Sequence, residues 1–275
     1  MTKGAGSDGE RRRLNIPGLF NGRDLGGLPA ADGRIIARGR LYRAEVLGYA
    51  GADELYSRWV PEQTAALRDL GIRTVIDMRG AAETVATPSA WREAARAKRG
   101  LSFPIDDGGE GTARDYVGML VAGEMGRFSA TDMGEHYVAT LENRADVFVS
   151  AIDAIANGAP ALVHCTEGKD RTGLLVALVL SLLGTPSRAI VEDYRLTEIW
   201  RPDRALAWAP RFAGTGLDLE RFRVLYESPP AAMEIALGHL ETVHGGAQSF
   251  LMTRGGMPAK TVSRLRNALL APPRA

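Results

Sequence analysis

The residues with the clearest potential for chemistry form one continuous run, 164–173, with the sequence HCTEGKDRTG. The run follows a short apolar stretch (161–164) and precedes a ten-residue apolar stretch of helical type (174–183). A loop between a strand and a helix N-terminus points successive backbone N–H groups at one place, and the helix dipole favours an anion there. Gly168 can supply the left-handed conformation that such a loop needs. The run therefore predicts an anion site with a thiol, Cys165, at its mouth.

The side chains of this run supply the groups needed to transfer a phosphoryl group. A helix N-terminus beside cations favours the thiolate of Cys165, which is the nucleophilic form. The planar fork of Arg171 can hold two oxygens of a tetrahedral oxyanion. Thr172 can bond the departing sulfur, and His164 can orient the loop through a backbone contact. The candidate ligands for the substrate are Thr166, Glu167, Gly168, Lys169 and Thr172.

Two simpler interpretations of the run were weighed. A lone cysteine at a strand end is most often just packed, but packing alone does not explain Arg171 six positions later, with a glycine between them. A nucleotide-binding loop of the form G-x-x-x-x-G-K-[ST] would need glycine at Val163 and serine or threonine at Asp170. The sequence excludes that second interpretation.

In the form H-C-x-x-G-K-D-R-T-G, the run resembles the loop of a bacterial branch of the cysteine-dependent protein tyrosine phosphatases. Shorter motifs extend the resemblance over nearly the whole chain. They are NGRDLGG (21–27), GRLYRAE (39–45), IDMRG (76–80), EDYRLT (192–197) and a helix over 264–270. The resemblance implies hydrolysis of a phosphomonoester through a cysteinyl-phosphate intermediate, without a cofactor. It implies phosphotyrosine as substrate, with activity extending to phosphoserine, phosphothreonine or phosphoinositides.

The resemblance also implies roles for neighbouring residues. Lys169 resembles a loop lysine linked to phosphoinositide recognition, and Asp170 resembles a loop aspartate proposed as general acid. Asp106, after Phe-Pro-Ile, is the alternative acid, although it lies one position away from the pattern of more distant relatives. Glu167 stands where the family commonly has a small residue. Its carboxylate either faces solvent or selects a substrate with a cationic group.

Two further features of the sequence each have two interpretations. Charged residues in the shorter motifs either cap turns and strand ends or contact substrate; these are Arg23, Asp24, Arg43, Asp77 and Arg79. The segment 194–230 is rich in aromatic residues and forms either a lid over the site or part of the core. Its aromatic residues include Trp200, Trp208, Phe212, Phe222 and Tyr226.

The overall composition restricts the classes of function. The 275 residues are 45% hydrophobic and 24% charged, which is typical of a globular protein and excludes disorder as the main state. Because 34 basic residues nearly balance 33 acidic ones, nothing favours nucleic acid or an anionic membrane as partner. A single cysteine excludes an internal disulfide framework. No metal ligands stand at a usable spacing, so neither a metal nor a cofactor is expected.

The expected partner is a phosphorylated protein, a phosphoinositide or a small-molecule phosphate. Alternatives to a protein phosphatase are a phosphatase of a sugar, inositol or nucleoside monophosphate, and a phosphate-binding module without turnover. The longest apolar run is far short of the roughly 20 residues that span a bilayer, and the first 13 residues are polar. The sequence thus predicts a cytoplasmic protein, or one exported without a standard signal peptide. It gives no indication of oligomeric state.

The pattern of elements predicts an α/β fold with a central, mostly parallel sheet flanked by helices, tyrosine-phosphatase-like, and a helical C-terminal half. Residues 1–13 are expected to form a flexible tail, and residues 14–275 a single phosphatase domain. Strands are expected at 74–78 and 161–164, and a short hairpin within 21–42. The expected helices are 62–70, 116–125, 135–157, 174–183, 190–199, 219–226, 231–243 and 261–270.

Overall fold

A five-stranded sheet forms the centre of the fold, with the strand order β1-β2-β7-β5-β6. The computed structural model describes residues 8–52, 54, 56–106, 119, 124–201, 203, 206, 209–212 and 218–272. The strands of the sheet are β1 (Arg23–Asp24), β2 (Leu41–Ala44), β7 (Ala161–His164), β5 (Thr74–Asp77) and β6 (Arg99–Ser102). Strand β1 pairs antiparallel with β2, and the other pairings are parallel. The predicted α/β class with a mostly parallel sheet is therefore confirmed.

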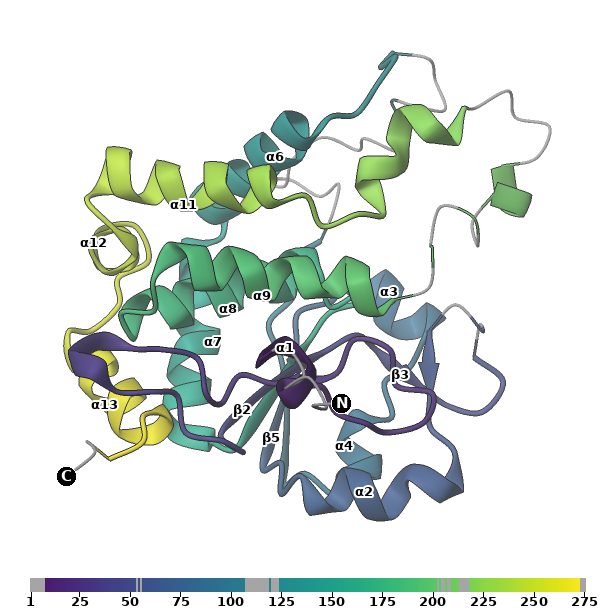
Figure 1. Cartoon of the computed structure of the whole chain (residues 1–275), viewed down its shortest axis with the longest axis horizontal. Helices are drawn as coiled ribbons and strands as arrows, with labels where there is room; N and C mark the ends of the chain where they lie inside the picture. The colour runs from purple at the N-terminus through teal and green to yellow at the C-terminus, as the bar shows by residue number, and fades with distance from the viewer. Residues whose placement is uncertain are drawn as a thin grey trace, which may run out of the picture.

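Helices cover both faces of this sheet (Figure 1). On one side lie α6 (Ala130–Asn143), α7 (Ala145–Gly158), α8 (Asp170–Leu182), α9 (Ser187–Trp200), α11 (Pro230–His244), α12 (Ala247–Thr253) and α13 (Lys260–Leu269). On the other side lie α2 (Thr64–Asp69) and α4 (Trp91–Ala94). The remaining short elements are α1 (Asp8–Arg12), α3 (Ala81–Ala86), β3 (Leu47–Gly48), β4 (Ser57–Arg58), and 3-10 turns η1 (Ala31–Gly33), η2 (Pro61–Gln63), η3 (Ala209–Phe212) and η4 (Leu219–Leu225).

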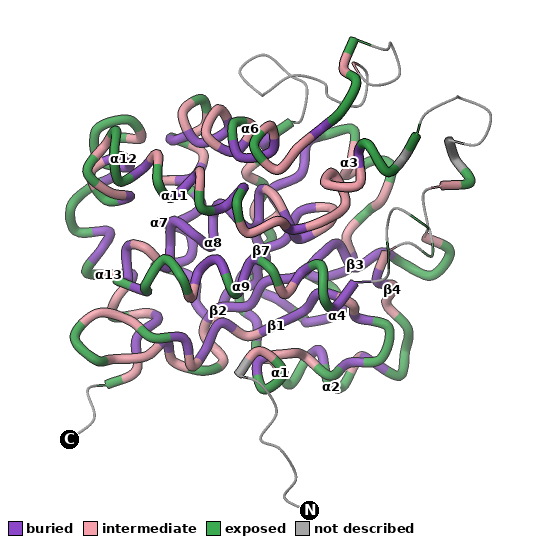
Figure 2. The backbone as a smooth tube through the Cα atoms, turned by 45° about the horizontal axis from the view of Figure 1, so that its top comes forward, coloured by how far each residue is buried: buried purple, intermediate pink, exposed green. Residues whose placement is uncertain are grey.

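The two-residue period of the strands explains why both faces are covered. Ile76 and Val163 point into the core beneath α7 and α8, whereas Val75 and Leu162 point into a second core that includes Trp91. Strands β2 and β7 are buried along their whole length, as Figure 2 shows. Strands buried on both faces read as continuous apolar runs, which is why the sequence of β7 was recognisable.

The register brings the ends of three strands together. His164 pairs with Ala44 of β2 on one side and with Asp77 of β5 on the other. The residues that follow these strands therefore meet at the same edge of the sheet. In parallel sheets ligands bind at this carboxyl edge.

Three predicted features need correction, and a fourth is not tested. The expected tail over 1–13 does not hold for residues 8–13, because residues 8–12 form α1, Arg13 forms a β-bridge with Arg23, and the Arg12 side chain is buried against α9. The helix expected over 135–157 is two helices that meet at Arg144. The segment expected as helix 219–226 is the 3-10 turn η4. The helix expected over 116–125 falls almost wholly outside the described residues.

The described helices include none with the length and apolar character that crossing a membrane requires.

Candidate active site

The loop that carries Cys165 lies at the carboxyl edge of the sheet, between β7 and α8. Cys165 is only 1% exposed. Gly168 has a φ of +65°, and a Cβ added there would lie 2.4 Å from the carbonyl oxygen of Ala44. Both the backbone conformation and the close approach to β2 therefore require glycine at this position, as the sequence predicts.

Four consecutive carbonyl groups of this loop accept hydrogen bonds from the protein around it. The bonds run from His164 Nδ1 to Cys165 O, from the Val46 amide to Thr166 O, from Asn21 Nδ2 to Glu167 O and from Arg43 Nη2 to Gly168 O, at 3.1, 3.1, 3.2 and 2.7 Å. In a trans peptide the carbonyl of one residue and the N–H of the next point in opposite directions. The amides of residues 166–169 are therefore turned away from these donors, which creates a nest for an anion.

One buried carboxylate, Asp193 of α9, holds the arginines beneath this loop. Its oxygens accept hydrogen bonds from Arg12 Nη1 at 2.6 Å, Arg43 Nη1 at 2.8 Å and Arg23 Nε at 3.1 Å. Burial by itself raises the pKa of Asp193, but the charges of Arg23, Arg43 and Arg12 outweigh it and hold the pKa well below its usual range. Burial and repulsion from Arg43 lower the pKa of Arg23 to about 9, so Arg23 remains charged at neutral pH.

This network decides between the two roles considered for the charged residues of the shorter motifs. Arg23 and Arg43 are 0% and 1% exposed and point at Asp193 rather than into the site. Asp24 accepts hydrogen bonds from the backbone amides of two glycines, each at 2.8 Å. Arg23 and Arg43 therefore support the loop from behind, and Asp24 caps turns of the chain.

His164, Asp77 and Arg79 form a second support. Burial lowers the pKa of His164, so the ring is neutral at pH 7. Its Nδ1–H then donates to the Cys165 carbonyl, while Nε2 faces the Ser89 hydroxyl at 3.2 Å. Arg79 Nη2 donates to Asp77 Oδ2 at 2.7 Å, which fixes the end of β5 beside the ring. The predicted orienting contact of His164 is present.

Arg171 lies in the first turn of α8, and its guanidinium group is hydrogen-bonded to a carboxylate, that of Glu83. Its Nη2 donates to Glu83 Oε1 at 2.7 Å and its Nη1 to Glu83 Oε2 at 2.5 Å. Nη1 also donates to the carbonyl of Ile105 at 3.0 Å, and the Thr166 hydroxyl donates to Glu83. Burial raises the pKa of Glu83, but the hydrogen bond and charge of Arg171 more than compensate and lower it. The guanidinium is thus held in place by an anion.

Sequence reasoning missed Glu83. It is the third residue of α3 and accepts a hydrogen bond from the Gly80 amide at 3.0 Å. Its spacing from Gly80 is a normal signal for the start of a helix. Nothing local indicates a contact with Arg171, 88 positions away.

Asp170, the predicted acid, is the first residue of α8 and is partly exposed. The Tyr137 hydroxyl of α6 donates to its Oδ1 at 2.5 Å and lies 2.8 Å from the Tyr194 hydroxyl of α9. Burial and the charge of Asp170 raise the pKa of Tyr137 well above its usual value, so Tyr137 stays a proton donor. One carboxylate oxygen of Asp170 is therefore anchored by a tyrosine pair that the sequence analysis did not identify.

The side chain of Lys169 is buried and held by backbone carbonyl groups. Its Nζ donates to the carbonyls of Leu225 and Glu227 at 2.6 and 2.9 Å and lies 3.4 Å from Asp170 Oδ1. Lys169 therefore also has Asp170 as an ion-pair partner, and its side chain is only 2% exposed. The ammonium group ties the loop to the end of η4.

Glu167, the departure from the family pattern, forms an ion pair with Arg201 at the end of α9. Arg201 Nε also lies 3.1 Å from Glu45 Oε2, and both of these side chains are buried. The Glu167 carboxylate is therefore partnered within the protein. The sequence allowed two interpretations of Glu167, a carboxylate that faces solvent and one that selects a cationic substrate. The ion pair with Arg201 agrees with neither.

The two remaining candidates, Asp106 and Thr172, make few polar contacts. Asp106 is exposed and follows Ile105, whose carbonyl binds Arg171, and its Oδ1 lies against Gly80 at the start of α3. The Thr172 hydroxyl is fully buried and has no hydrogen-bond partner within the described residues. The expected bond between Thr172 and the sulfur of Cys165 is not formed in this structure.

Some aromatic side chains of the segment considered as a lid pack inside the protein. Trp200 and Phe222 are 6% and 5% exposed, and Trp200 Nε1 donates to Glu10. For these two residues the structure shows core packing. Trp208 and the stretch 213–217 lie outside the described residues, so the lid itself stays a prediction.

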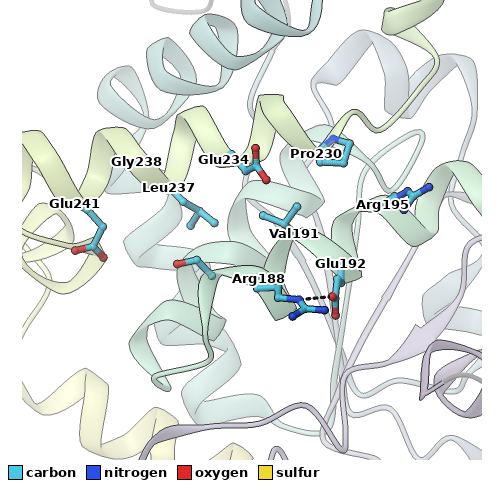
Figure 3. A pocket seen from close by; sticks show the side chains of 10 residues that line it. Arg188, Val191, Glu192, Arg195, Pro230, Glu234, Leu237, Gly238 and Glu241 are labelled. Atoms are coloured by element: carbon cyan, nitrogen blue, oxygen red, sulfur yellow. Dashed lines mark hydrogen bonds and ion pairs between the residues drawn. The ribbon is translucent and has the colours of Figure 1, made fainter.

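A cavity of about 520 Å³ lies between α9 and α11 (Figure 3). Val191, Pro230 and Leu237 form its apolar floor, with Arg188 and Glu192 joined at its margin. None of its lining residues belongs to the loop 164–173. The cavity is therefore separate from the site described above.

Comparison with known proteins places this site in a family. Residues 14–271 match the model of the tyrosine phosphatase family. Because the match covers nearly the whole chain, the protein belongs to this family and is a phosphomonoesterase. The predicted resemblance is confirmed.

Individual relatives agree with this assignment. A protein of Cupriavidus necator named as a tyrosine-protein phosphatase is 28% identical over 88% of this chain and 83% of its own length. The triple specificity protein phosphatase PtpB of Mycobacterium tuberculosis is 30% identical over 65% of this chain and 67% of its own. The crystal structure of P. aeruginosa TpbA, at 19% identity, covers 76% of this chain and 97% of its own with a TM-score of 0.33, and supports no inference.

The Asp193 network predicts a stability effect. In Asp193→Asn, Arg12, Arg23 and Arg43 would keep their charges without a counter-ion, so unfolding should become easier by about 3–5 kcal/mol at pH 7. Because the carboxylate has a depressed pKa in the folded state, its contribution is complete above the unfolded pKa of about 4 and declines as the pH falls below that value. Urea denaturation from pH 7 to pH 3 measures this.

The matched control is Glu192→Gln, the preceding residue of α9, which is exposed and pairs only on the helix surface with Arg188. It should change the free energy of unfolding by no more than about 0.5 kcal/mol. Equal effects of the two substitutions would contradict the role given to Asp193.

Proposed function

We propose that this phosphatase works in two steps through Cys165. The thiolate attacks phosphorus, the bond between phosphorus and the leaving oxygen breaks, and the phosphoryl group is carried as a thioester of phosphate on sulfur. Water then attacks this intermediate, releases inorganic phosphate and regenerates the thiolate. The observation that carries the proposal is the loop that follows Cys165, whose four carbonyls are held from behind so that its amides are turned away from these donors.

In this proposal Asp170 moves the protons. It protonates the leaving oxygen in the first step and takes a proton from water in the second. Tyr137 occupies Oδ1 of the carboxyl group at 2.5 Å, which favours Oδ2 as the oxygen that exchanges the proton. Tyr137 then acts as a positioning residue, because it binds Asp170 and takes no part in the reaction, and Tyr194 in turn holds the Tyr137 hydroxyl.

Arg171 would bind two equatorial oxygens of the phosphoryl group as their charge grows. In the structure both of its terminal nitrogens already bind Glu83. A phosphate dianion and this carboxylate require the same donors. Substrate binding in the proposed mechanism therefore includes an exchange in which Glu83 gives up part of its hold on Arg171 and on Thr166.

Phosphotyrosine is the proposed substrate, and the activity is proposed to extend to phosphoserine and phosphothreonine. The support comes from the family and from the name of the mycobacterial relative, a triple specificity phosphatase. Phosphoinositide recognition by Lys169 has less support, since its ammonium group is engaged by two carbonyls. This proposed order of substrate preference is tested by measuring kcat/KM for phosphopeptides, phosphoinositides and small-molecule phosphates. A preference for a sugar or nucleoside phosphate would contradict it.

Replacement of the nucleophile should separate chemistry from binding. Cys165→Ser is expected to lower turnover of para-nitrophenyl phosphate on the order of 10⁴-fold or more, while phosphate and tungstate still bind, because the amide nest and Arg171 remain. Steady-state rates in the presence of a chelator and calorimetric titration of tungstate provide the two measurements. Residual turnover near the parent rate would exclude Cys165 as nucleophile.

The loss of rate on removing the general acid should depend on the leaving group of the substrate. Asp170→Asn is expected to lower kcat by about 10²–10⁴-fold for an alkyl phosphate and far less for para-nitrophenyl phosphate, whose leaving group needs no proton. The matched variant is Asp106→Asn, which should lower both rates little. If Asp106→Asn shows the leaving-group dependence and Asp170→Asn does not, the acid is Asp106.

Neutralising the charge of Glu83 should strengthen the binding of anions at Arg171. Glu83→Gln keeps an acceptor for Arg171 but removes the competing charge, so phosphate is expected to inhibit at about fivefold lower concentration at low salt, an effect that salt reduces. Glu241→Gln, which removes one charge from the last turn of α11, controls for net charge. Weaker inhibition by phosphate in Glu83→Gln would instead mean that Glu83 must hold Arg171 in its binding geometry.

A further inference from the structure

Three side chains that can bind a metal ion converge at one end of the helix pair α6 and α11. Glu142 is the next-to-last residue of α6, and His239 and His244 lie in the C-terminal part of α11. His239 Nε2 lies 2.7 Å and His244 Nε2 lies 2.5 Å from the same oxygen, Glu142 Oε1. All three ligand atoms are within 4.8 Å of one another. The sequence analysis expected no metal ligands at usable spacing, because Glu142 lies about a hundred positions from either histidine.

The neighbours of these residues hold them in this arrangement. The ring of Phe250 packs edge-on against His244, with 5.0 Å between centroids. Arg254 Nε lies 3.2 Å from Glu142 Oε2, the oxygen that faces away from the histidines. Gly245 ends α11 with a φ of +71°, which places His244 in the last helical turn. One carboxylate oxygen and two imidazole nitrogens are thus oriented toward a common point.

Access to this point is open. The side chains of Glu142, His239 and His244 are 24%, 22% and 14% exposed, so an ion can reach them from solvent. A tetrahedral ion with ligands about 2.0–2.2 Å away separates its ligand atoms by roughly 3.3 Å. The two present hydrogen bonds would therefore lengthen by less than about 1 Å. Small rotations of these partly exposed side chains supply such a change without moving either helix.

We propose that Glu142, His239 and His244 form a zinc site, with water as the fourth ligand. Imidazole nitrogen and carboxylate oxygen are ligands that Zn²⁺ and Co²⁺ accept in tetrahedral geometry. The bound ion would join the C-terminal ends of α6 and α11, which pack against each other along their length. Since α6 also carries Tyr137, the ion fastens the helix that anchors Asp170. The site lies outside the Cys165 loop, and its three ligands take no part in the proposed reaction.

The test must separate this site from the thiol, because thiolates also bind zinc. It therefore uses full-length Cys165→Ser protein, stripped of metal by a chelator and titrated with Zn²⁺ in a calorimeter. One equivalent is expected to bind, and the thermal midpoint should rise by about 5 °C at a hundredfold excess over Kd. Co²⁺ should give the visible bands of a four-coordinate site without a sulfur-to-metal band.

Three added substitutions locate the site. Glu142→Gln, His239→Gln and His244→Gln each keep a hydrogen-bonding amide in the cluster but remove a ligand, and each should weaken zinc binding by at least about tenfold. The matched control, His136→Gln on the same helix α6, should bind zinc as the parent does. Circular dichroism shows that each variant is folded before titration.

The alternative is a hydrogen-bonded cluster of two histidines and one glutamate that takes no metal. Absence of zinc binding in the folded Cys165→Ser protein would establish that alternative. Unchanged affinity in the three glutamine variants would likewise overturn the proposal, as would loss of binding only in His136→Gln. None of these outcomes bears on the role of Cys165.

Discussion

The interaction on which the rest of the site depends is the contact between Asp193 and the arginines around it. A buried guanidinium without a counter-ion is costly, and here one carboxylate compensates Arg23 and Arg43 at once. Arg43, fixed in this way, holds the Gly168 carbonyl, and Arg23 fixes Asn21, which holds the Glu167 carbonyl. The direction of the loop amides is therefore decided by residues that bind the opposite side of the loop.

A carboxylate also holds Arg171, and the proposed mechanism requires this partner to leave in part. Asp193 is fully buried and its arginines are permanent partners, whereas the Glu83 side chain is 31% exposed and sits on a short helix. An exposed carboxylate can be exchanged for a phosphate at modest cost, because water solvates it once it is released. The guanidinium is thereby held in position without a ligand and remains exchangeable when one arrives.

The sequence predicts what depends on local pattern. The loop 164–173, the apolar strand before it and the buried helix after it are continuous in the chain, and their type could be read directly. The contacts that refine their roles join distant segments, such as Glu83 with Arg171, Tyr137 with Asp170 and Arg201 with Glu167. No spacing rule links residues so far apart, and this is why the partners of Lys169 and Glu167 were not expected and Glu83 was missed.

The electrostatics of the site follow from these pairings. Around the loop the buried arginines Arg12, Arg23, Arg43 and Arg201 face the acids Asp193, Glu45 and Glu167, so the opposite charges nearly cancel. A chain with a net charge of +1 adds no strong field of its own. Attraction of a phosphate must then come from short-range groups: the amides of 166–169, the α8 dipole and Arg171. Short-range donors are screened little by salt and recognise the shape of the phosphoryl group. Selection among phosphomonoesters therefore falls to the surfaces that surround the loop.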